Sequence, residues 1–290
     1  MRVSTSARIG VDVGGTKIEV AVVGPRGATL LRERVPTPKD NYEETVRAIA
    51  ALVRRAQDVA GAQAPIGIGT PGSLSKTTGR IINANSTALI GKPFKGDVES
   101  ALGRTVRMAN DANCLALSEA TDGAATNAHV VFAAILGTGV GGGVAIGGRI
   151  IEGPNGIAGE WGHNPLPWPQ PHELPGPPCY CGKSGCIETF LSGPSLQKAC
   201  ERIGEEAAFN EYEERLARSL ASVVNILDPD VIVIGGGVSN RTRLYDDVPR
   251  LLPQYVFSDC LRTRITQAAH GDSSGVRGAA MLWPEGASDE

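Results

Sequence analysis

Apolar residues follow two patterns, one typical of strands and one typical of helices, and the two patterns alternate along the chain. Short apolar segments are typical of buried strands, and they occur at Arg8–Val13, Ile18–Val23, Ile66–Gly69, Val106–Ala109, Val130–Leu136 and Val231–Ile234. We also expect strands at Ala28–Val35 and Arg264–Gln267. Helical spacing follows Asn41, recurs near Gly96–Leu102 and runs from Asp111 to about Thr121. It returns over Gly193–Cys200, in a long helix that ends at Leu227 and over Val276–Trp283. Strands that alternate with helices predict an α/β fold.

The first of the predicted helices has clear boundary signals. Asn41 takes the N-cap position, and Glu44 completes a capping-box pattern three residues later. Gly61 follows the last apolar residue of the pattern, where a glycine often ends a helix. We therefore predict a helix between Asn41 and Gly61.

A glycine-rich turn joins the first two predicted strands. Asp12 lies at the end of the first strand, and Gly14-Gly15-Thr16-Lys17 leads into the second. Consecutive N–H groups in such a turn can hold an anion, and Lys17 adds a positive charge. A simple hairpin turn is the alternative. The acid, the two glycines, the hydroxyl and the lysine in succession favour a phosphate-binding turn.

The same plan returns in the second half of the chain. The strand Val130–Leu136 runs into Gly137-Thr138-Gly139 and further glycines, and the strands Val144–Ile146 and Arg149–Ile151 follow. Strand, glycine turn and strand repeat the order of residues 8–23. This repetition indicates a degenerate internal duplication of a phosphate-binding hairpin.

Polar loops follow several of the predicted strands. Asn110-Asp111 comes directly after one strand, Thr70–Ser73 after another, and Gly235-Gly236-Gly237 after a third. Asn83–Thr87 is a further loop rich in hydrogen-bonding groups. An Asn-Asp pair between a strand and a helix can be only a helix cap, but open α/β sheets place reactive groups at the carboxyl ends of strands. We favour a catalytic role for Asp111.

One cluster of residues predicts a metal site. Three cysteines lie within eight residues, and a histidine lies sixteen residues before the first of them. The set is His163, Cys179, Cys181 and Cys186. One imidazole and three thiolates make a complete tetrahedral set for structural Zn²⁺, and Gly182 and Gly185 permit the tight backbone that this requires. A disulfide cluster is the alternative, and the absence of a signal sequence disfavours it.

Two glutamates flank the predicted zinc loop. Glu160 lies three residues before His163, and Glu188 lies two residues after Cys186. Metal binding would fix both backbones, and a histidine that binds a metal through one ring nitrogen can hydrogen-bond through the other. Each glutamate alone is typical of a solvated surface. Together, Glu160, His163 and Glu188 predict a site for a ligand rich in hydroxyl groups.

Composition and charge narrow the class of protein. A chain of 290 residues exceeds the usual size of a single core, so two lobes are expected. A net charge of −3 argues against a nucleic-acid-binding surface. No apolar run approaches ~18 residues, so we expect no membrane span. The first eight residues lack the apolar core of a signal peptide, and we expect a cytoplasmic protein.

The motifs occur together in one order that resembles a known family. They are Asp12-x-Gly-Gly-Thr-Lys17, Asn110-Asp111, Gly137-Thr-Gly139, Gly159-Glu-x-Gly-His163 and Cys179-x-Cys-Gly-x-x-Gly-Cys-x-Glu188. This series resembles the ROK family of sugar kinases and related repressors over essentially the whole chain. Four further segments are similar to bacterial ROK fructokinases: Asn83–Thr87, Ala109–Ala116, His163–Trp168 and His270–Ala280.

The resemblance implies a two-lobed, actin-like ATPase fold of the duplicated ribonuclease H type, with a zinc-binding loop at 159–188. It implies a smaller lobe at 1–121, with a C-terminal helix at 276–290 that packs back on it, and a larger lobe at 122–275. One departure is visible, because the segment between Lys198 and Phe209 is shorter than in many relatives. That departure puts the helices near it in doubt.

The resemblance also assigns the site. ATP phosphates would lie on the turns Asp12–Lys17 and Gly137–Gly139, Gly235–Gly237 would approach the adenosine, and Asp12 would help to position Mg²⁺. Sugar would be held by Asn110, Asp111, Glu160, His163 and Glu188. Asp111 would act as the general base, and His163, Cys179, Cys181 and Cys186 would hold one structural Zn²⁺ per chain.

The implied activity is ATP-dependent phosphorylation of a hexose. D-Fructose, phosphorylated at its 6-hydroxyl, is the expected acceptor, with mannose as a weaker substrate. A glucokinase or an N-acetylhexosamine kinase is the alternative, and a sugar-sensing repressor is a remote one, because only eleven residues precede Asp12. The expected partners are sugar, ATP and a second copy in a homodimer, with neither nucleic acid nor membrane.

Overall fold

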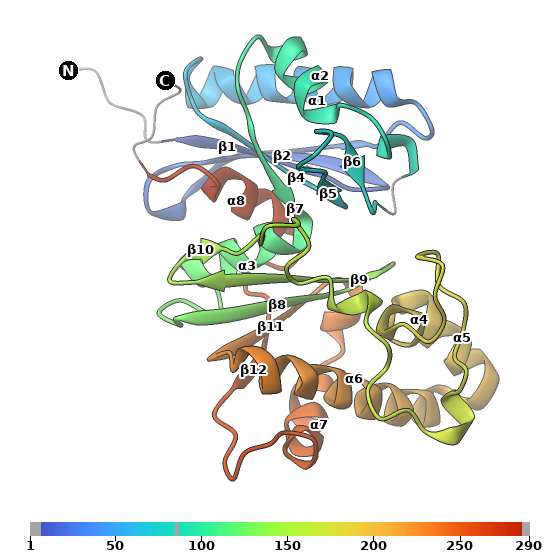
Figure 1. The fold of residues 1–290 in the computed structure, drawn as a ribbon. Coiled ribbons are helices and arrows are strands. Elements are labelled where there is room, and N and C mark those ends of the chain that lie inside the picture. The colour runs from blue at the N-terminus through green and yellow to red at the C-terminus, as the bar shows by residue number, and fades with distance from the viewer. Residues whose placement is uncertain (1–6, 85–86, 286–290) are drawn as a thin grey trace. The chain divides into compact units, whose positions relative to one another are not determined.

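The computed structural model describes residues 7–84 and 87–285. The chain forms two compact units (Figure 1). The first unit takes the residues up to Asp122, the segment Glu152–Ile157 and the residues from Ser273 onward. The second unit takes Gly123–Ile151 and Ala158–Asp272. None of the helices within the described ranges is both long and apolar enough to cross a membrane.

The first unit is built on a five-stranded sheet in the order β3-β2-β1-β4-β7. The strands are β1 (Arg8–Val13), β2 (Lys17–Val23), β3 (Thr29–Pro36), β4 (Ile66–Thr70) and β7 (Arg107–Asn110). The first three strands form an antiparallel meander, and β1, β4 and β7 are parallel. A small hairpin, β5 (Ser73–Leu74) with β6 (Ile81–Ile82), follows β4.

Helices cover both faces of this sheet (Figure 1). They are α1 (Tyr42–Ala60) and α2 (Phe94–Leu102) on one face, and α3 (Asp111–Asp122) and α8 (Ser274–Met281) on the other. The predicted cap of α1 is confirmed, because the Asn41 side chain accepts a hydrogen bond from the Glu44 N–H at 3.1 Å. Gly61 follows the last residue of that helix, as predicted.

The short helix α8 lies unusually close to the sheet. A Cβ atom on Gly10 of β1 would lie 1.9 Å from the backbone oxygen of Val276, and one on Gly67 of β4 would lie 1.8 Å from that of Ala279. Since no side chain fits these contacts, glycine is required at both strand positions. The predicted extension of this helix to residue 290 does not hold, since α8 ends at Met281, and residues 286–290 lie outside the described ranges.

The second unit repeats the strand plan of the first. Its sheet has the order β10-β9-β8-β11-β12, with an antiparallel meander followed by two parallel strands. The strands are β8 (Val130–Leu136), β9 (Val140–Ile146), β10 (Arg149–Ile150), β11 (Val231–Gly235) and β12 (Arg264–Gln267). The duplicated α/β architecture predicted from the sequence is therefore confirmed.

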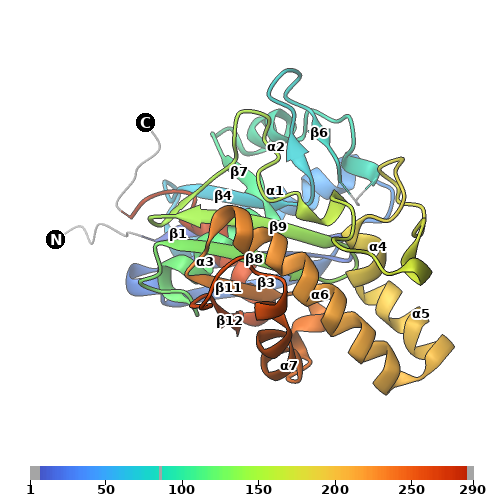
Figure 2. The ribbon, with the colours of Figure 1, turned by 60° about the horizontal axis from the view of Figure 1, so that its bottom comes forward.

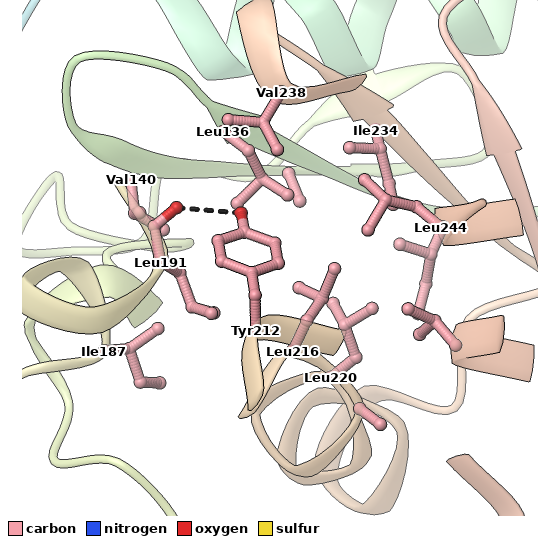
Figure 3. Packing of buried hydrophobic residues seen from close by; sticks show 14 of the residues in the cluster. Leu136, Val140, Ile187, Leu191, Tyr212, Leu216, Leu220, Ile234, Val238 and Leu244 are labelled. Atoms are coloured by element: carbon pink, nitrogen blue, oxygen red, sulfur yellow. Dashed lines mark hydrogen bonds between the residues drawn. The ribbon is translucent and has the colours of Figure 1, made fainter. Parts of the chain in front are cut away.

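Four helices belong to this second unit. They are α4 (Ile187–Leu191), α5 (Gly193–Ile203), α6 (Glu205–Leu227) and α7 (Leu244–Leu251). The helices α5 and α6 lie side by side (Figure 2). Tyr212, Leu216 and Leu220 of α6 point into a buried core with residues of β8 and β11 (Figure 3). The Tyr212 hydroxyl donates to the Leu191 carbonyl at 2.8 Å, so this buried phenol has a partner.

One expectation for the second unit needs correction, and one helix was not predicted. The turn after β8 is shorter than predicted. The next strand was expected at Val144–Ile146, but β9 already begins at Val140 and includes the following glycines. The helices α5 and α6 are separated at Gly204, whose φ of +84° favours glycine. The helix α7 was missed; it contains Pro249, a residue that normally breaks helices.

Candidate active site and metal cluster

The first predicted phosphate turn lies between β1 and β2 and is held by backbone and side-chain contacts. The Gly14 N–H donates to the Lys17 carbonyl at 2.9 Å. On the other side, the Thr37 hydroxyl donates to the Gly14 carbonyl at 2.7 Å. Gly15 and Thr16 at the tip are exposed. The turn is thus fixed at its base and open at its tip, as a binding turn should be.

Asp12 lies at the end of β1, beside this turn. Burial raises the pKa of its carboxyl group to about 7, and the negative charges of Asp111 and Glu19 add to the rise. Lys17 and Arg34 oppose the shift. A carboxylate is the kind of oxygen ligand that Mg²⁺ prefers, so the position of Asp12 fits the role that the resemblance assigns to it.

The raised pKa of Asp12 predicts a pH-dependent stability. An unfolded Asp ionises near pH ~3.9, whereas the folded carboxyl group keeps its proton up to about pH 7. The folded state therefore binds more protons across this window, and the free energy of unfolding falls as pH rises through it. Asp12→Asn removes the ionisation, so its stability relative to the parent should rise by roughly 1–3 kcal/mol between pH 4 and pH 8.

Urea unfolding at several pH values, without nucleotide or Mg²⁺, measures this difference. Asp58→Asn, at an exposed position of α1, is the control and should follow the parent at every pH. If the free energies of unfolding of the parent and Asp12→Asn change in parallel with pH, Asp12 has the same pKa in the folded and unfolded states, and the prediction is wrong.

Asn110 and Asp111 join the end of β7 to the start of α3. The Asn110 amide donates to the Gly72 carbonyl at 3.1 Å, which ties β7 to the loop after β4. The Ala112 N–H donates to both side chains, at 2.9 Å to Asn110 Oδ1 and at 2.8 Å to Asp111 Oδ1. Both residues thus cap α3, and these contacts also fix the Asp111 carboxylate at the carboxyl edge of the sheet.

Of the loop Asn83–Thr87, only part lies within the described residues. Asn83 adopts a φ of +57°, which Asn tolerates better than most residues. The predicted hydrogen-bonding residues at 85 and 86 lie outside the described ranges.

The second predicted phosphate turn, Gly137–Gly139, lies between β8 and β9. The Gly137 N–H donates to the Gly139 carbonyl at 3.0 Å, and the Gly137 carbonyl accepts from the Gly193 N–H at 2.7 Å. Glu188 also contacts this turn, because its Oε2 accepts from the Val140 N–H at 2.8 Å. A Cβ atom on Gly139 would lie 2.6 Å from the same oxygen.

This contact gives Glu188 a second task that the sequence did not reveal. The residue lies in the first turn of the helix α4, directly after the cysteine loop, and its carboxylate accepts a hydrogen bond from the backbone beside the predicted phosphate turn. The structure therefore links the cysteine loop to the turn through one side chain. The proximity of Gly139 explains why this turn position needs a glycine.

Glu160 precedes a 3-10 turn, Trp161–His163, that lies against β9. The Trp161 indole N–H donates to the Gly141 carbonyl at 2.8 Å, and a Cβ on Gly162 would lie 2.2 Å from the Val140 carbonyl oxygen. Burial raises the pKa of Glu160; the charge of His163 opposes the rise and that of Glu188 adds to it. Glu160 thus lies close enough to His163 and Glu188 for their charges to change its pKa.

The predicted metal ligands lie together in the second unit. The ligand atoms of His163, Cys179, Cys181 and Cys186 all lie within 4.8 Å of one another. The Cys181 and Cys186 sulfurs are 3.6 Å apart, and the Cys179 sulfur is 3.6 Å from His163 Nδ1. Tetrahedral Zn²⁺, with Zn–S of ~2.3 Å and Zn–N of ~2.0–2.1 Å, requires about 3.8 Å between sulfurs and about 3.6 Å from sulfur to nitrogen. The donor set and its spacing fit this ion.

The backbone of the cysteine loop has the tight turns that the sequence predicts. Gly182 and Gly185 have φ values of +87° and +72°, which favour glycine. The Gly182 N–H donates to the Cys179 carbonyl at 3.0 Å, and the Cys179 N–H donates to the Lys183 carbonyl at 2.8 Å. These bonds close the loop around the sulfurs.

Tyr180 is a neighbour of the metal cluster that sequence reasoning missed. His163 directs Nδ1 toward the sulfurs, and its Nε2 lies 3.0 Å from the Tyr180 hydroxyl. The two rings meet edge to face, with centroids 5.1 Å apart. A partner on the second nitrogen fixes the orientation of a metal-binding histidine. The available signal was the position of Tyr180 between two ligand cysteines.

A buried ion cluster braces the proline-rich part of the same loop. Glu173 accepts from Arg215 at 2.7 Å and from Arg218 at 2.8 and 3.0 Å. Arg218 also donates to the Trp168 carbonyl at 2.6 Å. Burial opposes the ionisation of Glu173, but the hydrogen bonds from the two arginines outweigh it and lower its pKa to about 2. The cluster anchors the loop to α6.

The third predicted loop, Gly235–Gly237, follows β11. Gly236 has a φ of +84°, and a Cβ there would lie 2.4 Å from the Leu136 carbonyl oxygen, so the loop passes close to β8. The Ser239 hydroxyl donates to the Gly236 carbonyl at 2.7 Å. A Cβ on Gly237 would meet no atom within 4 Å.

The predicted site residues thus form two groups. The first unit holds Asp12, the Gly14–Lys17 turn, Asn110 and Asp111, and the second unit holds the other predicted contacts and the metal ligands. The glycine turns of the two groups follow corresponding strands of the two sheets, because β1 and β8 occupy the same place in the repeated strand order.

Comparisons with known proteins agree with this architecture. The model of the ROK family matches residues 8–286. The N-acetyl-D-glucosamine kinase of Pectobacterium atrosepticum is 39% identical over 94% of this chain and 97% of its own length. The ROK hexokinase of Thermus thermophilus has a TM-score of 0.81 at 32% identity, covering 95% of this chain and 97% of that one.

A third similar protein is a ROK family glucokinase from Streptomyces griseus, whose structure holds glucose and AMPPNP. It has a TM-score of 0.81 at 29% identity and covers 97% of this chain and 100% of that one. The chain belongs to the ROK family, and its duplicated α/β architecture is the actin-like ATPase fold of ROK sugar kinases.

Proposed function

We propose that this ROK-family sugar kinase transfers the γ-phosphoryl group of ATP to the 6-hydroxyl of a hexose, with D-fructose as the preferred acceptor. The observation that carries the transfer is the pair of glycine turns at matching places in the two sheets. Asp12 accompanies the first turn and Glu188 contacts the second. Phosphoryl transfer depends mainly on positioning and on neutralising charge, and such turns supply both.

In this proposal each group of residues has its own role in the transfer. The turns hold the phosphates of ATP through backbone N–H groups, and Mg²⁺ beside Asp12 would neutralise part of their charge. Asp111 accepts the proton of the attacking hydroxyl. Asn110 holds the loop that ends in Gly72 against β7. Glu160 binds hydroxyl groups of the sugar, His163 does so through Nε2 once the sugar replaces the Tyr180 hydroxyl there, and Glu188 joins these residues to the phosphate turn.

We also propose that the cysteine cluster holds one structural Zn²⁺. The support is the donor set and its spacing, which fit tetrahedral Zn²⁺. Zinc would hold the backbone on both sides of the cluster, and therefore the positions of Glu160 and Glu188. Its part is to brace the sugar site, and it does not enter the transfer itself.

Two acceptors have specific support. The fructose proposal rests on four segments that are similar to ROK fructokinases, among them Ala109–Ala116, which contains Asp111, and His163–Trp168, which begins with a predicted ligand. N-Acetyl-D-glucosamine is the second candidate, because kinases named for that sugar are 38–40% identical to this chain. About six positions in ten differ from those kinases, which is enough to change the few residues that select a sugar.

Steady-state kinetics over a panel of acceptors tests the proposal. The panel is D-fructose, D-mannose, D-glucose, N-acetyl-D-glucosamine and N-acetyl-D-mannosamine, each with saturating MgATP. We expect the highest kcat/KM for fructose, with mannose next. A higher kcat/KM for N-acetyl-D-glucosamine would transfer the assignment to the second candidate, and activity with none of the five would contradict the proposal.

A further inference from the structure

Tyr180 and the acceptor sugar compete for one atom of His163. The Nδ1 atom of His163 lies 3.6 Å from the Cys179 sulfur, and its Nε2 atom lies 3.0 Å from the Tyr180 hydroxyl. A zinc ion on Nδ1 would leave the ring proton on Nε2, so this atom has a single hydrogen bond to donate. The Tyr180 hydroxyl and a sugar hydroxyl therefore exclude each other at Nε2.

The main chain on both sides of Tyr180 is fixed, whereas its side chain is largely exposed. Cys179 and Cys181, its two neighbours, both belong to the metal cluster, and the Cys179 N–H donates to the Lys183 carbonyl at 2.8 Å. The Tyr180 side chain is 63% exposed and meets the His163 ring edge to face. Exposed side chains change rotamer readily. Rotation of the side chain can therefore move the hydroxyl while the loop keeps its shape.

The second unit has room for the tyrosine ring to turn into. A cavity of about 790 Å³ is lined by Tyr180, by Glu188, by Thr138 of the second predicted phosphate turn, and by residues of the proline-rich loop and of α5. Leu174 and Pro178 are among these residues and give part of the lining an apolar character. An aromatic ring that enters such a cavity gains apolar contacts, and these offset the loss of the contact with His163.

The Tyr180 hydroxyl also lies near the two glutamates of the proposed sugar site. Partial burial raises the pKa of this hydroxyl, and the negative charges of Glu188, Cys179 and Glu160 add to the rise. The phenol therefore stays neutral. It is placed among the same three residues, Glu160, His163 and Glu188, that the proposed function assigns to the sugar.

We propose that Tyr180 is a gate for the acceptor: its hydroxyl holds His163 Nε2, and the sugar binds there only when the side chain has turned into the neighbouring cavity. The inference rests on the proposed function, which places the sugar at His163. Only molecules with the gate open bind sugar, so the apparent affinity is the intrinsic affinity reduced by the open fraction. A hydrogen bond of ordinary strength would close the gate in roughly two-thirds to nine-tenths of the molecules.

Tyr180→Phe tests the gate, because it keeps the ring and removes the oxygen from Nε2. We expect the Kd of the preferred sugar to fall about 3- to 10-fold and its KM to fall with it. Both kcat and the KM for ATP should stay within twofold, since the tyrosine takes no part in the transfer, and zinc content should equal that of the parent. Calorimetry without ATP, steady-state kinetics and elemental analysis measure these quantities.

Tyr255→Phe is the matched control. Its hydroxyl, also in the second unit, donates to Glu214 at 3.3 Å and to none of the proposed sugar residues. Its loss should leave sugar affinity, kcat and zinc content unchanged.

Unchanged or weaker sugar binding by Tyr180→Phe would overturn the gate, and weaker binding would show that the hydroxyl contacts the sugar or only orients His163. Loss of zinc from the variant would overturn it too, because the hydroxyl would then serve the metal cluster. A crystal structure of the parent with its sugar gives an independent check. The gate predicts a sugar hydroxyl at Nε2 and the Tyr180 hydroxyl beyond hydrogen-bond distance, whereas a bound sugar beside an intact contact of 3.0 Å contradicts it.

These outcomes separate the gate from the proposed function. A parent that phosphorylates no sugar of the panel contradicts the proposed function and the gate with it. An active parent whose Tyr180→Phe variant binds sugar no more tightly contradicts the gate alone.

Discussion

Asp111→Asn should lower kcat by about 10²–10⁴-fold while sugar binding stays within a few-fold of the parent. An amide of the same shape can still accept the hydrogen bond that the Ala112 N–H now donates to Asp111 Oδ1 at 2.8 Å. It cannot take the proton of the attacking hydroxyl, and loss of a general base costs about this factor. Rapid-quench or steady-state kinetics gives kcat, and calorimetry gives the sugar affinity.

The exposed Asp58→Asn variant is the control and should match the parent in both measurements. If Asp111→Asn turns over within a few-fold of the parent, Asp111 is only the cap of α3. In that case the helix-cap alternative that the sequence left open is the correct one.

Loss of one metal ligand should have the second large effect. We expect the parent to carry about one zinc ion per chain and Cys181→Ser to lose most of it, because three ligands hold structural Zn²⁺ far less tightly than four. Sugar affinity should fall about 10- to 100-fold, since the loop carries Glu160 and Glu188. The unfolding midpoint should fall by several degrees. Elemental analysis, calorimetry and thermal unfolding measure the three quantities.

Cys260→Ser provides a matched control for this experiment. Cys260 is exposed and is not one of the four ligands, so its replacement should change neither zinc content nor sugar affinity. Full zinc content in Cys181→Ser would remove the zinc assignment. Normal sugar affinity in a zinc-depleted variant would show that the metal does not brace the sugar site.

The strands and turns could be predicted because their signals are local. Val130–Leu136 is continuous, apolar and followed by a glycine, and the structure gives the same bounds for β8. The capping pattern of Asn41 and Glu44 and the positive φ of Gly182 and Gly185 also depend on neighbouring residues alone. In each case the residue type restricts the backbone directly.

What the sequence did not reveal depends on contacts between distant residues. Glu173 meets Arg218 across 45 positions, and Glu188 meets the Val140 N–H across 48. The spacing of these residues along the chain does not predict either contact. The helix α7 was missed because Pro249 is a local signal against a helix, and packing of Leu244 and Val248 into the core overrides it.

The acceptor sugar is the hardest feature to predict, because hexoses differ by the placement of single hydroxyl groups. Buried groups that the wrong isomer leaves unpaired make the selection, and some of them are backbone groups whose position no residue type reveals. Asn113 illustrates the point, since its type gives no sign that its side chain is buried and that its Oδ1 has no hydrogen-bond partner among the described residues.

The most direct test of the central claim is the identity of the product. ³¹P NMR of the protein with MgATP and D-fructose should show the γ-phosphate signal replaced by a phosphomonoester coupled to the two protons on carbon 6, in step with the formation of ADP. That result is the one predicted here. If zinc-loaded protein leaves ATP unchanged with fructose and with every other sugar of the panel, the assignment of this chain as a hexose 6-kinase is contradicted.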